Sequence, residues 1–154
     1  MRPAARPPER TERTDDSTTR RRPPARSSPA RPSAVRAVAA GAAVVTVAAG
    51  LAVRAGADGA FAKYAGSALY TVLLCTLVAF CAPRARPAVV GATGLGLSWA
   101  VEFAQLTGVP AELSAHSAAA RLVLGSTFNA PDLLWYAVGA ACAWAILRAA
   151  GQRR

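Results

Sequence analysis

Four apolar stretches, separated by short polar connections, follow a polar N-terminal segment. An α-helix needs about 20 predominantly apolar residues to cross a hydrocarbon core of roughly 30 Å, and the last stretch is slightly short of that length. The pattern predicts an all-α membrane protein with four transmembrane helices. The predicted spans are residues 35–53, 65–82, 88–106 and 132–147.

The first apolar stretch is the least hydrophobic, because alanine supplies much of it and Leu51 is its one leucine. Close packing should therefore hold this helix, with Gly41 and Gly50 letting neighbouring helices approach. A cleaved signal peptide is an alternative, since Ala-Gly-Ala at residues 55–57 resembles a cleavage site. The long polar segment before the apolar core argues against cleavage.

The N-terminal segment, residues 1–34, is rich in proline, arginine, serine and threonine and has no apolar periodicity. Such a composition cannot bury enough surface to offset the entropy of ordering, so we expect a disordered basic tail. The arginines at 20–22 resemble a twin-arginine signal, but two prolines follow where an apolar core should begin. The four-helix domain is expected over residues 35–148, followed by a short basic C-terminus at 149–154.

The positive charges indicate how the helices are oriented. Net charge is +10, and the N-terminal 36 residues hold ten of the eighteen Lys and Arg residues. The connection at 83–87 carries two basic residues and the end of the chain from Arg148 carries three. The segment at 54–63 carries two, and the long connection at 107–130 carries only Arg121. By the positive-inside rule, both termini should be cytoplasmic and the two longer connections outside.

The basic tail also bears on the partners of the protein. Its arginines lie among prolines and serines, without interleaved aromatic residues or a folded face, so no nucleic-acid partner is expected. Beside a membrane, the same charges attract anionic lipids. Membrane lipids are therefore the expected partners.

Glu102 lies well inside the third apolar stretch, where a carboxylate costs roughly 2.5–3.5 kcal/mol on insertion scales. Residues three or four apart share one face of a helix. On this helix, that face consists of Gly91, Gly94, Ser98, Glu102 and Gln105. The last helix has a similar stripe of Asp132, Tyr136, Gly139 and Ala143.

These polar residues are expected to lie at the same depth in the membrane. At about 1.5 Å per residue, Glu102 lies about 21 Å from the cytoplasmic end of its helix, in the outer third of the hydrocarbon core. Asp132 and Tyr136 enter from the outer side and should reach the same level. The sequence therefore predicts an outward-opening polar pocket for a substrate or a lipid head group. Its candidate residues are Glu102, Gln105, Asp132, Tyr136, Arg121 and Lys63.

These acidic residues also have purely structural interpretations. Glu102 could pair with Arg121 or Lys63 simply to lock the helices together. Asp132 could be a first-turn acid favoured by the helix dipole, with Asn129 as the N-cap. Both alternatives remain open at this stage.

The connection at 107–130 is predicted to contain one short helix, which Pro110 can open and Gly125 and Ser126 can end. It could lie flat on the outer interface as an amphipathic helix, or form a re-entrant segment buried in protein.

Few residues suggest metal or catalytic chemistry. Cys75, Cys81 and Cys142 are expected to be small buried hydrophobic residues, and His116 stands alone. No metal site and no cofactor are expected. No serine, histidine or cysteine accompanies the two acids in a catalytic pattern, so no catalytic residue is assigned and an enzyme is not favoured.

Three sequence motifs resemble a known family. They are Lys63-Tyr64-x-Gly66-x-x-Leu69-Tyr70, Glu102-x-x-Gln105-Leu106, and Leu122-Val-Leu-Gly125-x-x-Phe128-x-x-x-Asp132-Leu133-x-x-Tyr136-x-x-Gly139. They resemble an uncharacterised family of small bacterial membrane proteins, a domain of unknown function called DUF2809. The resemblance runs from about residue 55 to residue 147. More distantly, the arrangement is similar to the VanZ-like family, which has a Glu-x-x-Gln helix and a paired acidic helix and is linked to glycopeptide (teicoplanin) resistance.

The sequence and the resemblance together favour a multi-pass protein of the bacterial cytoplasmic membrane. It would bind or act on a component of the cell envelope through the outer-leaflet pocket. One alternative is a structural or assembly partner, whose faces of small residues pack against another membrane protein. A second is a small transporter subunit, although the chain has no inverted repeat to support it.

Overall fold

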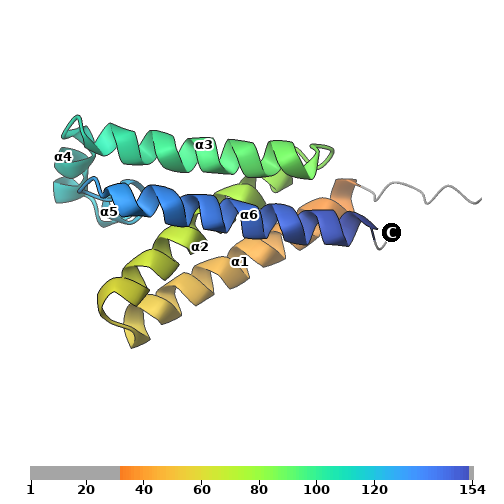
Figure 1. The fold of residues 1–154 in the computed structure, drawn as a ribbon, viewed down its shortest axis with the longest axis horizontal. Helices are drawn as coiled ribbons and strands as arrows, with labels where there is room; N and C mark the ends of the chain where they lie inside the picture. The colour runs from red at the N-terminus through yellow and green to blue at the C-terminus, as the bar shows by residue number, and fades with distance from the viewer. Residues whose placement is uncertain (1–31, 153–154) are drawn as a thin grey trace, which may run out of the picture.

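The structure, a computed structural model, describes residues 32–152. Over that range the chain forms six α-helices and no strand (Figure 1). Their bounds are α1 Pro32–Gly56, α2 Gly59–Cys81, α3 Pro87–Gln105, α4 Val109–His116, α5 Ala118–Leu124 and α6 Ala130–Gln152. The tail predicted at 1–34 lies outside the described residues up to Arg31, as does the end of the basic C-terminus at 153–154.

Three helices, α1, α2 and α6, are long and apolar enough to cross a membrane. The pair α3 and α4 meets the same criteria together, although the two helices are bent by 88° at their junction. The described chain therefore has three candidate spans, or four if the bent pair counts as one. Many large apolar side chains also remain exposed on the outside of the helices, which is typical of a surface that faces lipid. The all-helical prediction is confirmed.

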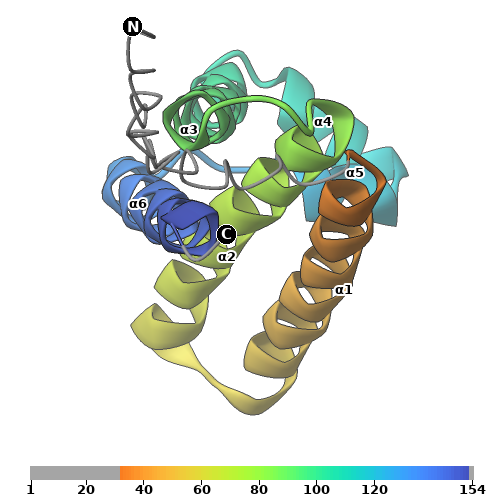
Figure 2. The same ribbon diagram turned by 90° about the vertical axis from the view of Figure 1, so that its right-hand side faces the viewer.

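Helix α2 is the centre of the packing. It contacts α1, α3 and α6, and α3 also packs against α6. Within the described residues, α1 packs against α2 and against no other helix, so it stands to one side (Figure 2). The start of α1 and the end of α6 lie at the same end of the bundle, opposite α4 and α5 (Figure 1).

Two glycines set how closely α3 and α6 approach α2. A Cβ at Gly94 would collide with Sγ of Cys75 and lie 3.2 Å from its backbone nitrogen. A Cβ at Gly139 would collide with the carbonyl oxygen of Ala68. The faces predicted for α3 and α6 are confirmed. On α3 the predicted residues are buried except Gln105, which is half-buried. On α6 all four predicted residues are buried, namely Asp132, Tyr136, Gly139 and Ala143.

The prediction for the glycines of α1 is wrong. A Cβ at Gly41 or Gly50 would meet no atom within 4 Å. Helix α1 instead turns another face towards α2, on which Ala39 and Thr46 are buried. Near its start, the Nε–H of Arg36 donates to the carbonyl oxygen of Phe80, 3.2 Å away.

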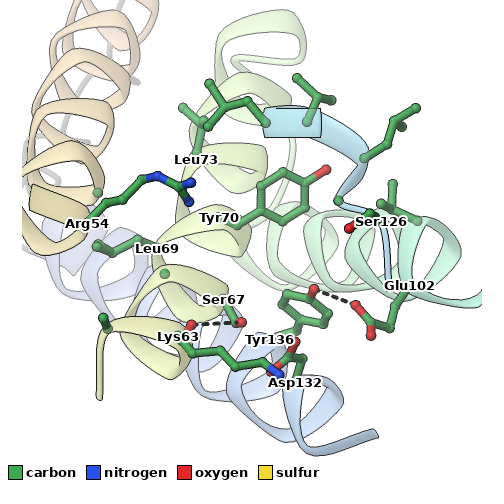
Figure 3. A pocket seen from close by; sticks show the side chains of 18 of the residues that line it. Arg54, Lys63, Ser67, Leu69, Tyr70, Leu73, Glu102, Ser126, Asp132 and Tyr136 are labelled. Carbon is green, nitrogen blue, oxygen red and sulfur yellow. Dashed lines mark hydrogen bonds between the residues drawn. The ribbon is translucent and has the colours of Figure 1, made fainter. Parts of the chain in front are cut away.

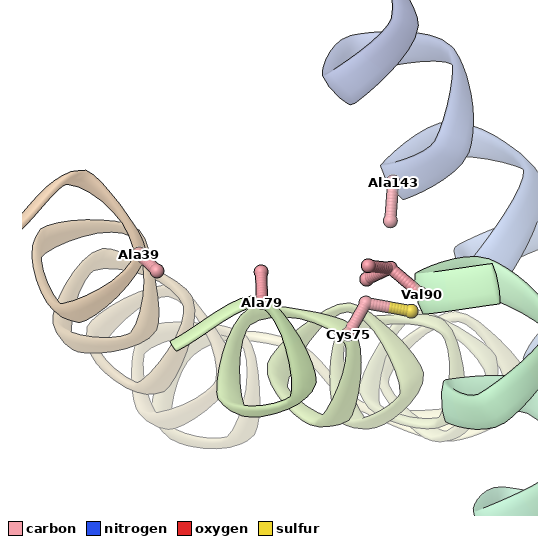
Figure 4. Close-up of a cluster of buried hydrophobic side chains, with 5 residues drawn as sticks. All are labelled: Ala39, Cys75, Ala79, Val90 and Ala143. Carbon is pink, nitrogen blue, oxygen red and sulfur yellow. The ribbon is translucent and has the colours of Figure 1, made fainter. Parts of the chain in front are cut away.

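Small side chains form the buried cluster at the end of the bundle that holds the start of α1 and the end of α6. Ala39, Cys75, Ala79, Val90 and Ala143 come from all four long helices (Figure 4). Cys75 is buried as predicted, but Cys81 and Cys142 are exposed. They lie outside the faces that pack, and an apolar thiol needs no protein cover on a surface that faces lipid.

The connection between α3 and α6 contains two short helices where one was predicted. Pro110 lies in the first turn of α4, after Gly108 adopts a positive φ of 78°. The break falls at Ser117, whose backbone is extended and whose hydroxyl accepts from the N–H of Ala120 at the start of α5. Helix α5 ends where predicted, before Gly125 with its φ of 66°.

Candidate functional site

Glu102 has an ionisable side chain, yet the residue is only 1% exposed. Each of its two carboxylate oxygens accepts a hydrogen bond. Oε1 accepts from the backbone N–H of Asn129, and Oε2 accepts from the hydroxyl of Tyr136 at 2.7 Å (Figure 3). Hydrogen bonds to a charged group contribute about 1.5–3 kcal/mol each, so two of them are comparable to the roughly 2.5–3.5 kcal/mol cost of placing the carboxylate in hydrocarbon. Neutral donors on α6 and its preceding loop thus hold this carboxylate.

Asn129 links the two buried acids. Its backbone N–H donates to Glu102, and its side-chain amide donates to Oδ1 of Asp132 at 2.7 Å. Asp132 is 7% exposed and lies in the first turn of α6, where its own N–H donates to the carbonyl oxygen of Asn129. The sequence proposed Asn129 only as an N-cap. In the structure its side chain donates a hydrogen bond to a carboxylate instead.

Gln105 lies one turn beyond Glu102 on α3 and connects α3 to the end of α5 by a hydrogen bond. Its Nε2 donates to the carbonyl oxygen of Leu124 at 2.7 Å, and Ser114 of α4 donates to the carbonyl oxygen of Gly125 at 2.7 Å. The side-chain oxygen Oε1 of Gln105 is buried and has no hydrogen-bond partner among the described residues. An acceptor is therefore left unused next to the acids.

A cavity of about 610 Å³ adjoins these groups, at the end of the bundle that holds α5 and the α1–α2 connection. Its polar side consists of Glu102, Gln105, Asp132 and Tyr136. Its apolar walls come from α1, α2 and α5, with Val47, Leu51, Leu69, Leu73 and Leu122 among them. Because α1 contacts only α2, the cavity separates α1 from α3, α5 and α6.

Two cations line the same cavity. Arg54 is in the last turn of α1 and Lys63 near the start of α2, and both are exposed. In Figure 3, the Lys63 side chain extends towards Asp132, and Arg54 reaches from α1 towards Tyr70. The cavity therefore has cations on its α1–α2 side and acids on its α3–α6 side.

The structure brings five of the six predicted pocket residues together, since Lys63, Glu102, Gln105, Asp132 and Tyr136 all line the cavity. Arg121 does not line it and is exposed on α5.

The sequence did not single out Arg54 or Tyr70 as cavity residues, nor Asn129 as a hydrogen-bond donor to the two acids. The sequence contains only weak indications that Arg54 and Tyr70 line the cavity. Tyr70 belongs to the first family motif, and Arg54 lies at the start of the first connection between apolar stretches. Asn129 donates to Glu102 through its backbone N–H, which every residue except proline has.

The site supplies hydrogen-bond acceptors and cations to a ligand. Among the described residues, no group of three or more histidine, cysteine, aspartate or glutamate side chains could hold a metal ion. Acceptors and cations around an apolar-walled cavity suit recognition of an amphipathic molecule.

The fold and this cavity define a small helical protein with apolar outer faces and a buried pair of carboxylates. A family model described as "Protein of unknown function (DUF2809)" matches residues 56–140, more than half of the chain. The chain belongs to that family, as its motifs indicated. The matched range contains every site residue named above except three residues of α1, which are Val47, Leu51 and Arg54. No curated protein and no solved structure matches the chain.

Proposed function

We propose that this protein is a multi-pass protein of the bacterial cytoplasmic membrane that binds an amphipathic component of the cell envelope in its cavity. The observation that carries the proposal is the buried Glu102 carboxylate beside an apolar-walled cavity that α1 leaves open on one side. Ionisable groups at membrane depth are expensive and usually functional. A cavity of about 610 Å³ is also within the size range of roughly 300–1,000 Å³ typical of ligand sites.

The proposed topology has four spans, both termini in the cytoplasm and the cavity in the outer leaflet. Charge supports this orientation. Within the described residues, the end opposite the cavity carries Arg36, Arg84, Arg86 and Arg148 and no acid. The cavity end carries three basic residues and all four acids of residues 32–152. An excess of Lys and Arg marks the cytoplasmic side.

Aromatic side chains support an interfacial position for the cavity end. Tyr64 stacks on Trp135 with ring centroids 5.4 Å apart, and Phe103 stacks on Phe128 at 6.3 Å. The indole N–H of Trp99 donates to the carbonyl oxygen of Leu133. Tyrosine and tryptophan are enriched where a membrane meets water. In this proposal, α3 spans the membrane and α4 turns along the interface, as the 88° bend allows.

The second candidate function is an assembly partner of another membrane protein. The observation that favours it is α1, which packs only against α2 and exposes Val38, Val44, Val45 and Leu51. A partner helix could cover that surface, but lipid chains could cover it equally well.

The proposed function is tested by filling the cavity. Gly66 lines it, and a Cβ at that position would meet no atom within 4 Å, so Gly66→Leu should occupy the space without disturbing the helices. We expect native mass spectrometry to find envelope lipid retained by the wild-type protein after mild detergent extraction and lost from this variant.

The matched control is Gly96→Leu. Gly96 is also a helical glycine whose Cβ would meet nothing, but it is exposed on α3 and does not line the cavity. This variant should retain lipid as the wild type does. Equal retention by all three proteins would contradict the proposal, as would a stably bound protein partner with no lipid in the cavity.

A further inference from the structure

We infer, on the basis of the proposed function, that the cavity selects a lipid with two head-group features. One is a phosphate, which lies between Arg54 and Lys63. The other is a hydroxyl or ammonium donor, which reaches the acceptors at Glu102, Asp132 and Gln105. The inference rests on the cations that α1 and α2 contribute to the cavity and on the acceptors that α3 and α6 contribute, with Lys63 extending from α2 towards Asp132.

The α3–α6 side has more acceptors than donors. A carboxylate has about four lone-pair positions, and Glu102 uses one position on each oxygen. One oxygen of Asp132 is bonded to the amide of Asn129, and Oε1 of Gln105 is buried without a partner among the described residues. A ligand that donates hydrogen bonds would satisfy acceptors that the described side chains leave unused. A ligand with only acceptors would be repelled there.

The α1–α2 side has the opposite character. Arg54 offers a planar set of N–H donors that suits phosphate oxygens, and Lys63 adds a second positive charge from the neighbouring helix. Both side chains are exposed at the rim, whereas Glu102 and Asp132 are buried. A phosphate at the rim with its donor groups further in therefore matches both sides. A purely cationic amphiphile would be repelled at the rim.

The apolar walls of the cavity indicate that the remainder of the ligand, beyond its head group, is apolar. Val47 and Leu51 of α1 face the cavity together with Leu69 and Leu73 of α2. Because α1 contacts no helix except α2 within residues 32–152, acyl chains can leave the cavity sideways between α1 and the other helices. A lipid in the surrounding bilayer could thus enter without leaving the membrane, so we commit to a lipid and not to a soluble phosphate compound.

The test compares three lipids with identical acyl chains on the full-length, delipidated protein by native mass spectrometry. Phosphatidylglycerol has both a phosphate and free hydroxyl donors, phosphatidylcholine has the phosphate without such donors, and diacylglycerol has a hydroxyl without phosphate. We expect phosphatidylglycerol to bind most tightly. Soluble glycerol phosphate should not displace it.

Charge-removing variants locate the phosphate. Arg54→Gln and Lys63→Gln should each weaken phosphatidylglycerol binding about five-fold, the equivalent of about 1 kcal/mol per interfacial cation, and leave diacylglycerol binding unchanged. The control is Arg121→Gln, which removes a cation at the same end of the bundle from an exposed position outside the cavity. Its affinity for phosphatidylglycerol should match that of the wild type.

Failure of this inference is distinguishable from failure of the proposed function. Equal affinity for the three lipids would overturn the head-group assignment, as would equal losses in Arg54→Gln and Arg121→Gln. Displacement by glycerol phosphate would overturn the choice of a lipid. In those cases, the proposed function would still stand if Gly66→Leu abolished lipid binding. If the wild type bound none of the three lipids, the head-group inference would fail. The proposed function would fail with it only if the extracted wild-type protein also retained no envelope lipid.

Discussion

At the scale of single residues, the main finding is that neutral donors hold the carboxylate of Glu102. Charge pairing with Lys63 or Arg121 was one open interpretation of the sequence, but the hydrogen bonds come from Asn129 and Tyr136. The sequence located Glu102 and Tyr136 at the same depth because helical rise is regular. It could not identify Asn129 as a donor, because the direction of a backbone N–H depends on how the preceding loop folds.

The hydroxyl of Tyr136 gives a direct test of this network. Tyr136→Phe removes one of the two donors to a buried carboxylate and should lower the free energy of unfolding by about 1–3 kcal/mol. Reversible unfolding in mixed micelles measures the change. Tyr64→Phe is the control, since it keeps the ring that stacks on Trp135, and the donors to Glu102 are Asn129 and Tyr136. If the two variants were equally stable, the hydroxyl of Tyr136 would not support Glu102.

At the scale of helices, small residues decide which pairs pack closely. The stripes on α3 and α6 were predictable from their period, since residues three or four apart share a face. For α1, the sequence offered several small residues on different faces, and the choice of Gly41 and Gly50 was wrong. Which face of an alanine-rich helix packs depends on the position of its neighbours, and its own composition contains little of that information.

The close packing of α6 against α2 can be tested by a substitution at Gly139. Gly139→Ala places a methyl group against the carbonyl oxygen of Ala68, which is backbone and cannot rotate away. Overpacking of this kind should cost about 1–3 kcal/mol in unfolding free energy. Gly96→Ala, at an open helical position, should instead leave stability unchanged or raise it by up to about 1 kcal/mol. A tolerated Gly139→Ala would mean that α2 and α6 do not pack this closely.

At the scale of the whole molecule, the bundle has two different ends. A small-residue cluster from four helices lies at one end, and the polar cavity at the other. Basic residues without acids mark the cluster end of the described chain. If this asymmetry sets the orientation in the membrane, residues at the two ends must react from opposite sides.

Cysteine labelling of cells measures that orientation. In a background without the three native cysteines, His116→Cys at the exposed end of α4 should react with a membrane-impermeant maleimide added to intact cells. Arg84→Cys, in the connection between α2 and α3, should react only after the cells are permeabilised. The reverse pattern would invert the topology and place the cavity in the inner leaflet.

The sequence by itself determined the all-helical class, the approximate positions of the long helices, the buried faces of α3 and α6 and the family. These follow from the period and length of apolar segments and from local motifs, which are properties of nearby residues. Only the tertiary structure decided that α1 packs against α2 alone, that Asn129 joins the two acids, and that Arg54 shares a cavity with Glu102 while Arg121 does not. Those facts depend on contacts between segments far apart in the chain, and helix packing in a membrane can satisfy the same apolar pattern in several ways.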